Sequence, residues 1–125
     1  MTLSCKTVVK RSAEEIPSQT RRAGIRERVL LSREDCPHQN IVLIDIDQGA
    51  EVELHPFPTS ESYFVLEGTI EIFFPGSAEV LRKGDLCHLP PKEVHGLRSR
   101  DGPAQVLLIF APPFGRESQE VPSRR

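Results

Sequence analysis

The stretch GAEVELHPFPTSESYFVLEG, residues 49–68, decides the fold of this chain. Residues 51–55 alternate strictly between polar and apolar side chains, which predicts a half-buried β-strand. Residues 61–67 read as a second strand that ends at Gly68. The two prolines within 56–60 cannot continue a sheet ladder, because proline lacks the backbone N–H. The stretch therefore predicts two short strands joined by an irregular bend.

Short strands separated by turn signals continue on both sides of this stretch. The expected strands span 41–48, 69–74, 86–89, 94–98 and 104–110, with a shorter one around 79–81. The strands 61–67 and 69–74 are separated by Gly68 alone, which favours a tight hairpin. Eight glycines and eleven prolines in 125 residues argue against a helical bundle. The pattern indicates an all-β fold, an antiparallel sandwich or barrel.

The two ends of the chain are less regular. We expect an N-terminal arm with the first strands over 1–38, a barrel core over 39–111, and a polar tail over 112–125. The one helical candidate covers 12–16, with Ser12 as N-cap and Glu15 as its capping-box partner. We expect the tail to be poorly ordered unless a partner chain holds it.

Composition excludes several classes of protein. The net charge of −2 is too close to zero to predict nucleic-acid binding. The longest apolar run, 106–111, is far too short to span a membrane. The first residues carry no apolar export signal, and the three cysteines show no disulfide-like spacing. We therefore expect three free thiols in a cytoplasmic protein without nucleic-acid or membrane partners.

Charge is distributed unevenly along the chain. Residues 1–40 carry eight positive and five negative side chains, whereas residues 41–110 carry five positive and eleven negative ones. This asymmetry suits a homodimer in which one arm crosses the acidic body of the partner. A basic cluster, Arg21, Arg22, Arg26 and Arg28, has no interleaved aromatic residues. We interpret the cluster as a solvated or dimer-facing surface.

A second pattern follows the first after a short gap. It reads GDLCHLPPKEVHGLRS over residues 84–99. With residues 49–68 it resembles the two motifs of the cupin superfamily, G-x5-H-x-H-x3,4-E-x6-G and G-x5-P-x-G-x2-H-x3-N. The chain looks like a small single-domain cupin of the conserved-barrel type, and the resemblance covers its central half.

The resemblance implies a fold and a site. The implied fold is a jelly-roll, or double-stranded β-helix, barrel of antiparallel strands. Cupins typically hold one divalent metal inside the barrel, and the positions of their ligands carry over to His55, Glu61 and His95. Imidazole and carboxylate donors together suit Fe, Mn, Zn, Ni or Cu, and three ligands leave coordination positions open.

One departure from the motif matters for this site. Phe57 stands where the first motif has its second histidine, and a phenyl ring cannot ligate a metal. Three interpretations follow: a metal bound through three ligands, His88 moving in as a substitute ligand, or a pocket that has lost its metal. Lys92 and Ser99 replace a motif glycine and asparagine, and we expect these two changes to have little effect.

The remaining site candidates are assigned from the strand pattern. Glu61 alternates with Tyr63 and Val65, so all three share one face, and an interior Glu61 must be paired or metal-bound. Phe57 and Tyr63 form an aromatic pocket wall or, alternatively, core packing. His88 is assigned a structural or pocket-lining role, and His38 a surface position.

These residues support two main hypotheses and one weaker hypothesis. The first is a metal-dependent enzyme that acts on a small molecule, of the dioxygenase, isomerase or decarboxylase type. The alternative is a metal-free cupin that binds or senses a small molecule without catalysis. A purely structural module is less favoured, because a barrel interior without function is more stable when it is apolar.

Overall fold

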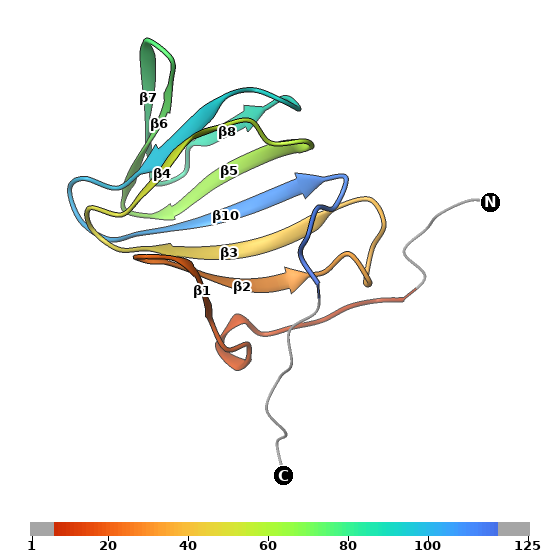
Figure 1. Ribbon diagram of the computed structural model, residues 1–125. Helices are drawn as coiled ribbons and strands as arrows, with labels where there is room; N and C mark the ends of the chain where they lie inside the picture. Colours follow the sequence, from red (N-terminus) through yellow and green to blue (C-terminus); the bar gives the residue numbers. More distant parts are fainter. Residues whose placement is uncertain (1–6, 118–125) are drawn as a thin grey trace.

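Ten antiparallel strands and one short turn are the regular elements of the computed structural model, which describes residues 7–117 (Figure 1). After a single 3-10 turn, η1 (Ala13–Glu15), the strands are β1 (Gln19–Arg22), β2 (Ile25–Leu31), β3 (Asn40–Ile46), β4 (Glu51–His55), β5 (Ser60–Glu67), β6 (Thr69–Phe74), β7 (Ser77–Arg82), β8 (Leu86–Leu89), β9 (His95–Arg98) and β10 (Ala104–Ala111). The predicted strands between residues 41 and 110 are all present, with ends shifted by a few residues.

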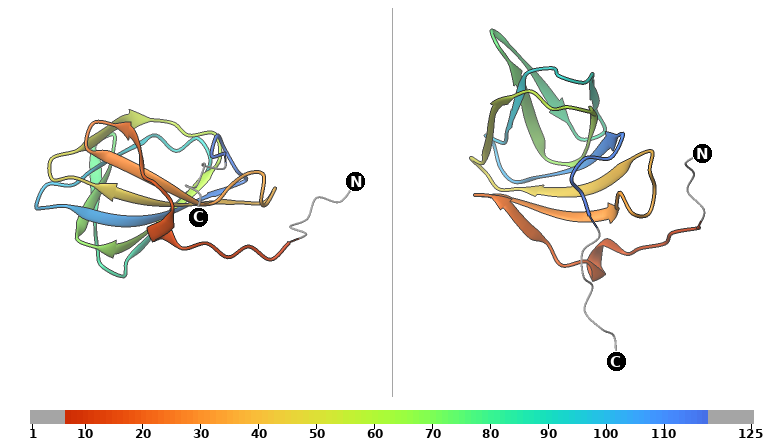
Figure 2. Two further views of the ribbon diagram at one scale, coloured as in Figure 1. Left: turned by 90° about the horizontal axis from the view of Figure 1, so that it is seen from below. Right: turned by 45° about the vertical axis from the view of Figure 1, so that its right-hand side comes forward.

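The strands form two sheets that enclose one interior. The six-stranded sheet has the order β1-β2-β3-β10-β5-β8, and the four-stranded sheet has the order β4-β9-β6-β7. Figure 2 shows the two sheets curving toward each other around this interior. The fold is a jelly-roll barrel, as predicted. Its core is a cluster of buried aliphatic and aromatic side chains that both sheets contribute, including Val42, Val65, Ile70, Ile72, Leu97, Val106 and Phe110.

Strand β5 turns a polar face into this interior. Glu61, Tyr63 and Val65 are buried, whereas Phe64 between them is exposed. The shared face predicted from their alternation is therefore confirmed. In the larger sheet β5 is the strand next to the edge strand β8, and it pairs with β10 on its other side.

The N-terminal capping prediction is wrong in detail. Residues 13–15 form only a 3-10 turn, and the Ser12 side chain makes no capping hydrogen bond. A segment of this length gains one backbone turn, which does not offset the cost of nucleating an α-helix. The following residues, β1 and β2, form the hairpin that opens the six-stranded sheet.

The described part of the C-terminal tail, residues 112–117, is held by its own chain. The Phe114 amide donates to Asn40 Oδ1 at 2.9 Å, and the Arg33 amide donates to the Arg116 carbonyl at 2.9 Å. These contacts attach residues 112–117 to the barrel without a partner chain, which the expectation of a poorly ordered tail did not include. The buried amide of Asn40 supplies the attachment, which the polar composition of the tail does not reveal. Residues 1–6 and 118–125 lie outside the described residues.

The cysteines differ from the expectation of three free thiols. Cys36 is disulfide-bonded, Cys87 is free, and Cys5 lies outside the described residues. The distance between two cysteines in the fold cannot be read from their spacing along the chain. The disulfide at Cys36 therefore removes the reason for expecting a reducing compartment. Within residues 7–117, no helix is long and apolar enough to cross a membrane.

Gly68 offers a direct test of the β5–β6 connection. It has φ +79°, and an added Cβ would lie 2.5 Å from the Pro103 carbonyl oxygen and 2.9 Å from Ala104 Cα. Gly76 has φ +82° with nothing within 4 Å of an added Cβ, so it is a matched control. Gly76→Ala should lower the free energy of unfolding by about 1–2 kcal/mol, the left-handed backbone cost alone.

Gly68→Ala should lower the free energy of unfolding by at least about 1 kcal/mol more than Gly76→Ala, because the backbone of residues 103–104 must also move. Urea denaturation of both variants measures the difference. Equal losses of unfolding free energy in the two variants would show that the close approach of Gly68 to the start of β10 does not constrain the barrel.

Candidate functional site

Two histidines face each other across the smaller sheet. In the β4–β9 pair, His55 lies opposite His95, and their ring centroids are 5.2 Å apart. Each ring has Nδ1 2.8 Å from the carbonyl oxygen two residues earlier, that of Glu53 for His55 and that of Glu93 for His95. A carbonyl only accepts, so Nδ1 carries the proton and Nε2 keeps its lone pair in the neutral ring. The backbone thus fixes both rings with Nε2 available as a ligand or base.

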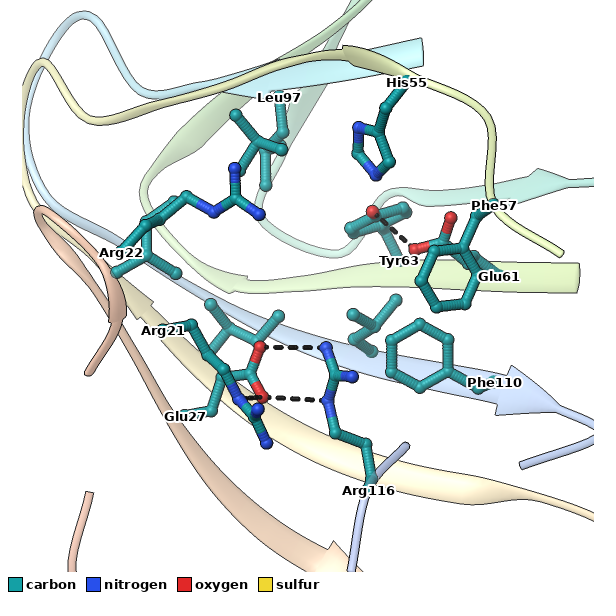
Figure 3. A pocket seen from close by; sticks show the side chains of 14 residues that line it. Arg21, Arg22, Glu27, His55, Phe57, Glu61, Tyr63, Leu97, Phe110 and Arg116 are labelled. Atoms are coloured by element: carbon teal, nitrogen blue, oxygen red, sulfur yellow. Dashed lines mark hydrogen bonds and ion pairs between the residues drawn. The ribbon is translucent and has the colours of Figure 1, made fainter. Parts of the chain in front are cut away.

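Glu61 approaches these histidines from the larger sheet. It is only 4 % exposed, and the Tyr63 hydroxyl donates to its Oε2 at 2.9 Å (Figure 3). Its Oε1 lies 3.1 Å from His95 Nε2. That contact is not aligned as a hydrogen bond, and Oε1 has no aligned partner among the described residues. One oxygen of a buried carboxylate is therefore available to a further group.

The close packing of these groups changes their protonation. Burial lowers the pKa of His95, but the hydrogen-bonding distance and negative charge of Glu61 outweigh that effect, so the pKa of His95 is raised. Burial, followed by the charge of Glu61, raises the pKa of Tyr63 well above its ordinary value. Tyr63 therefore keeps its proton at neutral pH and remains a donor to Glu61.

Phe57 belongs to both the core and the wall of the site. Its ring stacks on Phe110 with centroids 4.9 Å apart and meets Phe114 edge-on at 5.0 Å. Its carbonyl accepts a 2.7 Å hydrogen bond from the amide of Lys92, which has φ +70°. Lys92 thus adopts the left-handed backbone that the glycine of the motif takes readily. Phe57 thus packs against the core and also lines a cavity.

A cavity of about 400 Å³ lies beside these groups. Both sheets line it: Val52, His55 and Leu97 from the smaller sheet, and Ile44, Glu61, Tyr63, Leu108 and Phe110 from the larger one. Phe57, in the connection between β4 and β5, also lines it. The structure thus places His55, Phe57, Glu61 and Tyr63 on one cavity, and His95 in contact with Glu61. His88 lies elsewhere: it is exposed on β8, its Nδ1 is 2.8 Å from Ser62 Oγ, and it does not line this cavity.

Four charged residues at the other end of the cavity were not assigned to the site from the sequence. Glu27, 4 % exposed, accepts from Arg21 Nε at 2.9 Å and from Arg116 Nε at 3.0 Å. Arg22 also lines the cavity (Figure 3). Interpreting Arg21 and Arg22 as a solvated or dimer-facing surface is therefore incomplete, because both border the interior.

The sequence pattern does mark one of these four residues, Glu27. Glu27 occupies the buried phase of β2 between Ile25 and Val29, where an apolar residue is expected. Arg116 follows the last strand in a polar tail, and no pattern marks it. It reaches the cavity because residues 112–117 fold back onto Asn40.

The donor types at the histidine end fit a divalent metal. Two imidazole Nε2 atoms and Glu61 Oε1, which has no aligned hydrogen bond, are a two-histidine, one-carboxylate set of donors, which suits transition metals. Among residues 7–117, however, no three His, Cys, Asp or Glu side chains are already drawn together closely enough to hold an ion. His55, Glu61 and His95 therefore fit a metal by chemistry, and His55 or its partners must adjust to bind one.

The architecture matches several solved structures. KdgF from Halomonas sp. has a TM-score of 0.79 and 22 % identity, covering 86 % of this chain and 96 % of that chain. The polyketide cyclase RemF from Streptomyces resistomycificus has a TM-score of 0.77 and 16 % identity, covering 91 % and 87 %. Ectoine synthase from P. lautus has a TM-score of 0.77 and 24 % identity, covering 86 % and 80 %. At these identities the likeness shows a shared fold.

Sequence comparison gives the family. The uncharacterized protein MJ1618 from Methanocaldococcus jannaschii is 28 % identical over 85 residues, which cover 66 % of this chain and 68 % of that protein. The family model described as the cupin domain matches residues 42–110, more than half of the chain. The match includes both motif segments and the strands that carry His55, Glu61 and His95. This chain is a small member of the cupin superfamily.

Proposed function

We propose that this cupin is an enzyme that acts on a small molecule in the barrel interior and holds a divalent metal through His55, Glu61 and His95. The observation that carries the proposal is the buried Glu61 Oε1, which has no aligned partner within residues 7–117, beside histidines whose Nδ1 atoms are fixed by backbone carbonyls. Metal-binding histidines almost always have such a fixed outer nitrogen. A bound ion of this kind supplies Lewis-acid activation of a substrate oxygen.

The other residues of the site prepare the cavity for this chemistry. The Tyr63 hydroxyl orients Glu61 by occupying Oε2, which leaves Oε1, without an aligned hydrogen bond, as the oxygen that would bind the metal. Phe57, stacked on Phe110, closes one wall with apolar surface and limits water beside His55. A cavity of about 400 Å³ is of the size that encloses a small organic molecule.

A metal-free cupin that binds or senses a small molecule is the second candidate. Two observations favour it. Phe57 replaces a motif histidine, and His95 and Glu61 already contact each other at 3.1 Å and partly satisfy one another without an ion. In that case, the same cavity binds its ligand through the Tyr63 and Glu61 pair and its apolar walls.

Metal content separates the two candidates. Protein purified without chelator should carry close to one equivalent of a transition metal, measured by elemental mass spectrometry. His55→Ala should lower the metal affinity at least about ten-fold, because it removes one of three ligands. His88→Ala is the control and should retain the metal, since His88 lies on the outer face of β8.

Phe57→His tests the same proposal in the opposite direction. It restores the histidine of the first motif and should raise the metal affinity, again by about ten-fold or more. Less than a tenth of an equivalent of metal in the unaltered protein, with no rise in Tm on adding Fe, Mn, Zn, Ni or Cu, would contradict the metal proposal and support the second candidate.

The contact between His95 and Glu61 predicts a pH effect in metal-free protein. Because the pKa of His95 is raised in the folded state, the folded chain binds this proton more tightly than the unfolded chain. The resulting stabilisation is present below the ordinary histidine pKa of 6.5 and is lost as the pH rises through the folded pKa. Glu61→Gln removes the charge and leaves the burial, so the pKa of His95 should fall. An NMR titration of the imidazole measures it, and an unchanged pKa in the variant would refute the assignment.

A further inference from the structure

The charges that line the cavity do not balance. Three arginines, Arg21, Arg22 and Arg116, face two carboxylates, Glu27 and Glu61. Glu27 accepts hydrogen bonds from two of these arginines: Arg21 donates from Nε, and Arg116 donates from both Nε and Nη2. At the opposite end, Glu61 accepts a hydrogen bond from Tyr63 and contacts His95. Arg22 is the one cavity cation left over in the described part of the chain.

Arg22 is placed to contact a molecule inside the cavity. It is the last residue of β1, and its guanidinium projects inward beside Leu97, with His55 beyond (Figure 3). Its side chain makes no hydrogen bond or ion pair with any residue between 7 and 117. A guanidinium is a rigid fork of donors that matches a carboxylate with two parallel hydrogen bonds. An arginine without a partner at the edge of a partly open cavity therefore favours a negatively charged group there.

The surface between Arg22 and Glu61 is mostly apolar. Ile44, Leu97 and Leu108 are among the residues that line the cavity, and Phe110, which also lines it, stacks on Phe57. Such a lining binds a carbon skeleton or ring and provides few partners for polar groups. The complementary molecule has one anionic group at the Arg22 end, an apolar body, and its reactive part at the Glu61 end.

We propose that Arg22 binds the carboxylate of the cavity's small-molecule ligand and so selects monocarboxylic acids. One uncompensated cation matches a single negative charge. A phosphate dianion would add a second charge to an interior that already holds two carboxylates, and Arg21 and Arg116 are engaged by Glu27. The inference rests on the proposed function only for the reactive end, since Arg22 is not one of the three residues proposed to hold the metal.

Matched ligand pairs test the proposal by calorimetry. Benzoate and benzamide have nearly the same shape and differ in charge, and inorganic phosphate serves as the competing anion. The titrations use the full chain with EDTA present, so that a carboxylate binding to a metal does not contribute. The unaltered protein should bind benzoate at least about ten-fold more tightly than benzamide.

In Arg22→Gln that ratio should fall to within about two-fold, and Arg22→Lys should retain an intermediate preference, because it keeps the charge and loses the fork. Arg26→Gln is the control: it removes the same charge from neighbouring β2, where Arg26 pairs with Asp47 outside the cavity, and should leave the ratio unchanged. Arg22 is exposed, so these variants should keep the Tm of the unaltered protein.

Three results would overturn the proposal: no preference for benzoate in the unaltered protein, a preference that survives Arg22→Gln, or tighter binding of phosphate than of benzoate. None of them depends on metal content. Failure of the metal proposal would appear in the elemental analysis while the charge preference in EDTA persists, so the two failures are distinguishable.

Discussion

The burial of the Glu61 carboxylate is the interaction on which the site depends. A carboxylate inside a barrel is costly unless hydrogen bonds or charges compensate it. Here Tyr63 donates to one oxygen, and His95 approaches the other from the second sheet. This requirement explains why Tyr63 shares the inward face of β5 and why His95 is held by the Glu93 carbonyl. Burying Glu61 costs free energy and leaves one of its oxygens beside a cavity. A purely structural barrel would not need a carboxylate in this position.

Phe57 limits the number of metal ligands that this arrangement can offer. In the cupin motif its position carries a further ligand, and here an aromatic ring packs on Phe110 and Phe114 instead. The ring joins the histidine end of the cavity to the C-terminal segment. Arg116 Cζ lies over the Phe110 ring, 4.8 Å from its centroid. Replacing a ligand by this ring therefore couples the site to residues 112–117, which also hold Glu27 in place through Arg116.

The strands and the placement of Glu61, Tyr63, His55 and His95 in the fold were predictable from the sequence, because alternation and motif spacing depend on neighbours along the chain. Glu61, Tyr63 and Val65 share a face as their two-residue period requires, and His55 and His95 come together as the motifs imply. The arginines were not assigned, because their role depends on long-range contacts. Arg116 reaches Glu27 across 89 positions of sequence, and Cys36 forms a disulfide that no local spacing indicates. The homodimer and the cytoplasmic location stay predictions.

One measurement addresses the central claim most directly: the anomalous diffraction of crystals grown with the metal that co-purifies with the protein, or with added Mn or Zn. The account predicts a single strong peak within coordination distance, about 2.0–2.2 Å, of His55 Nε2, His95 Nε2 and Glu61 Oε1. A cavity without such a peak, with Glu61 still held by Tyr63 and His95, would contradict the claim that this cupin is built around a metal.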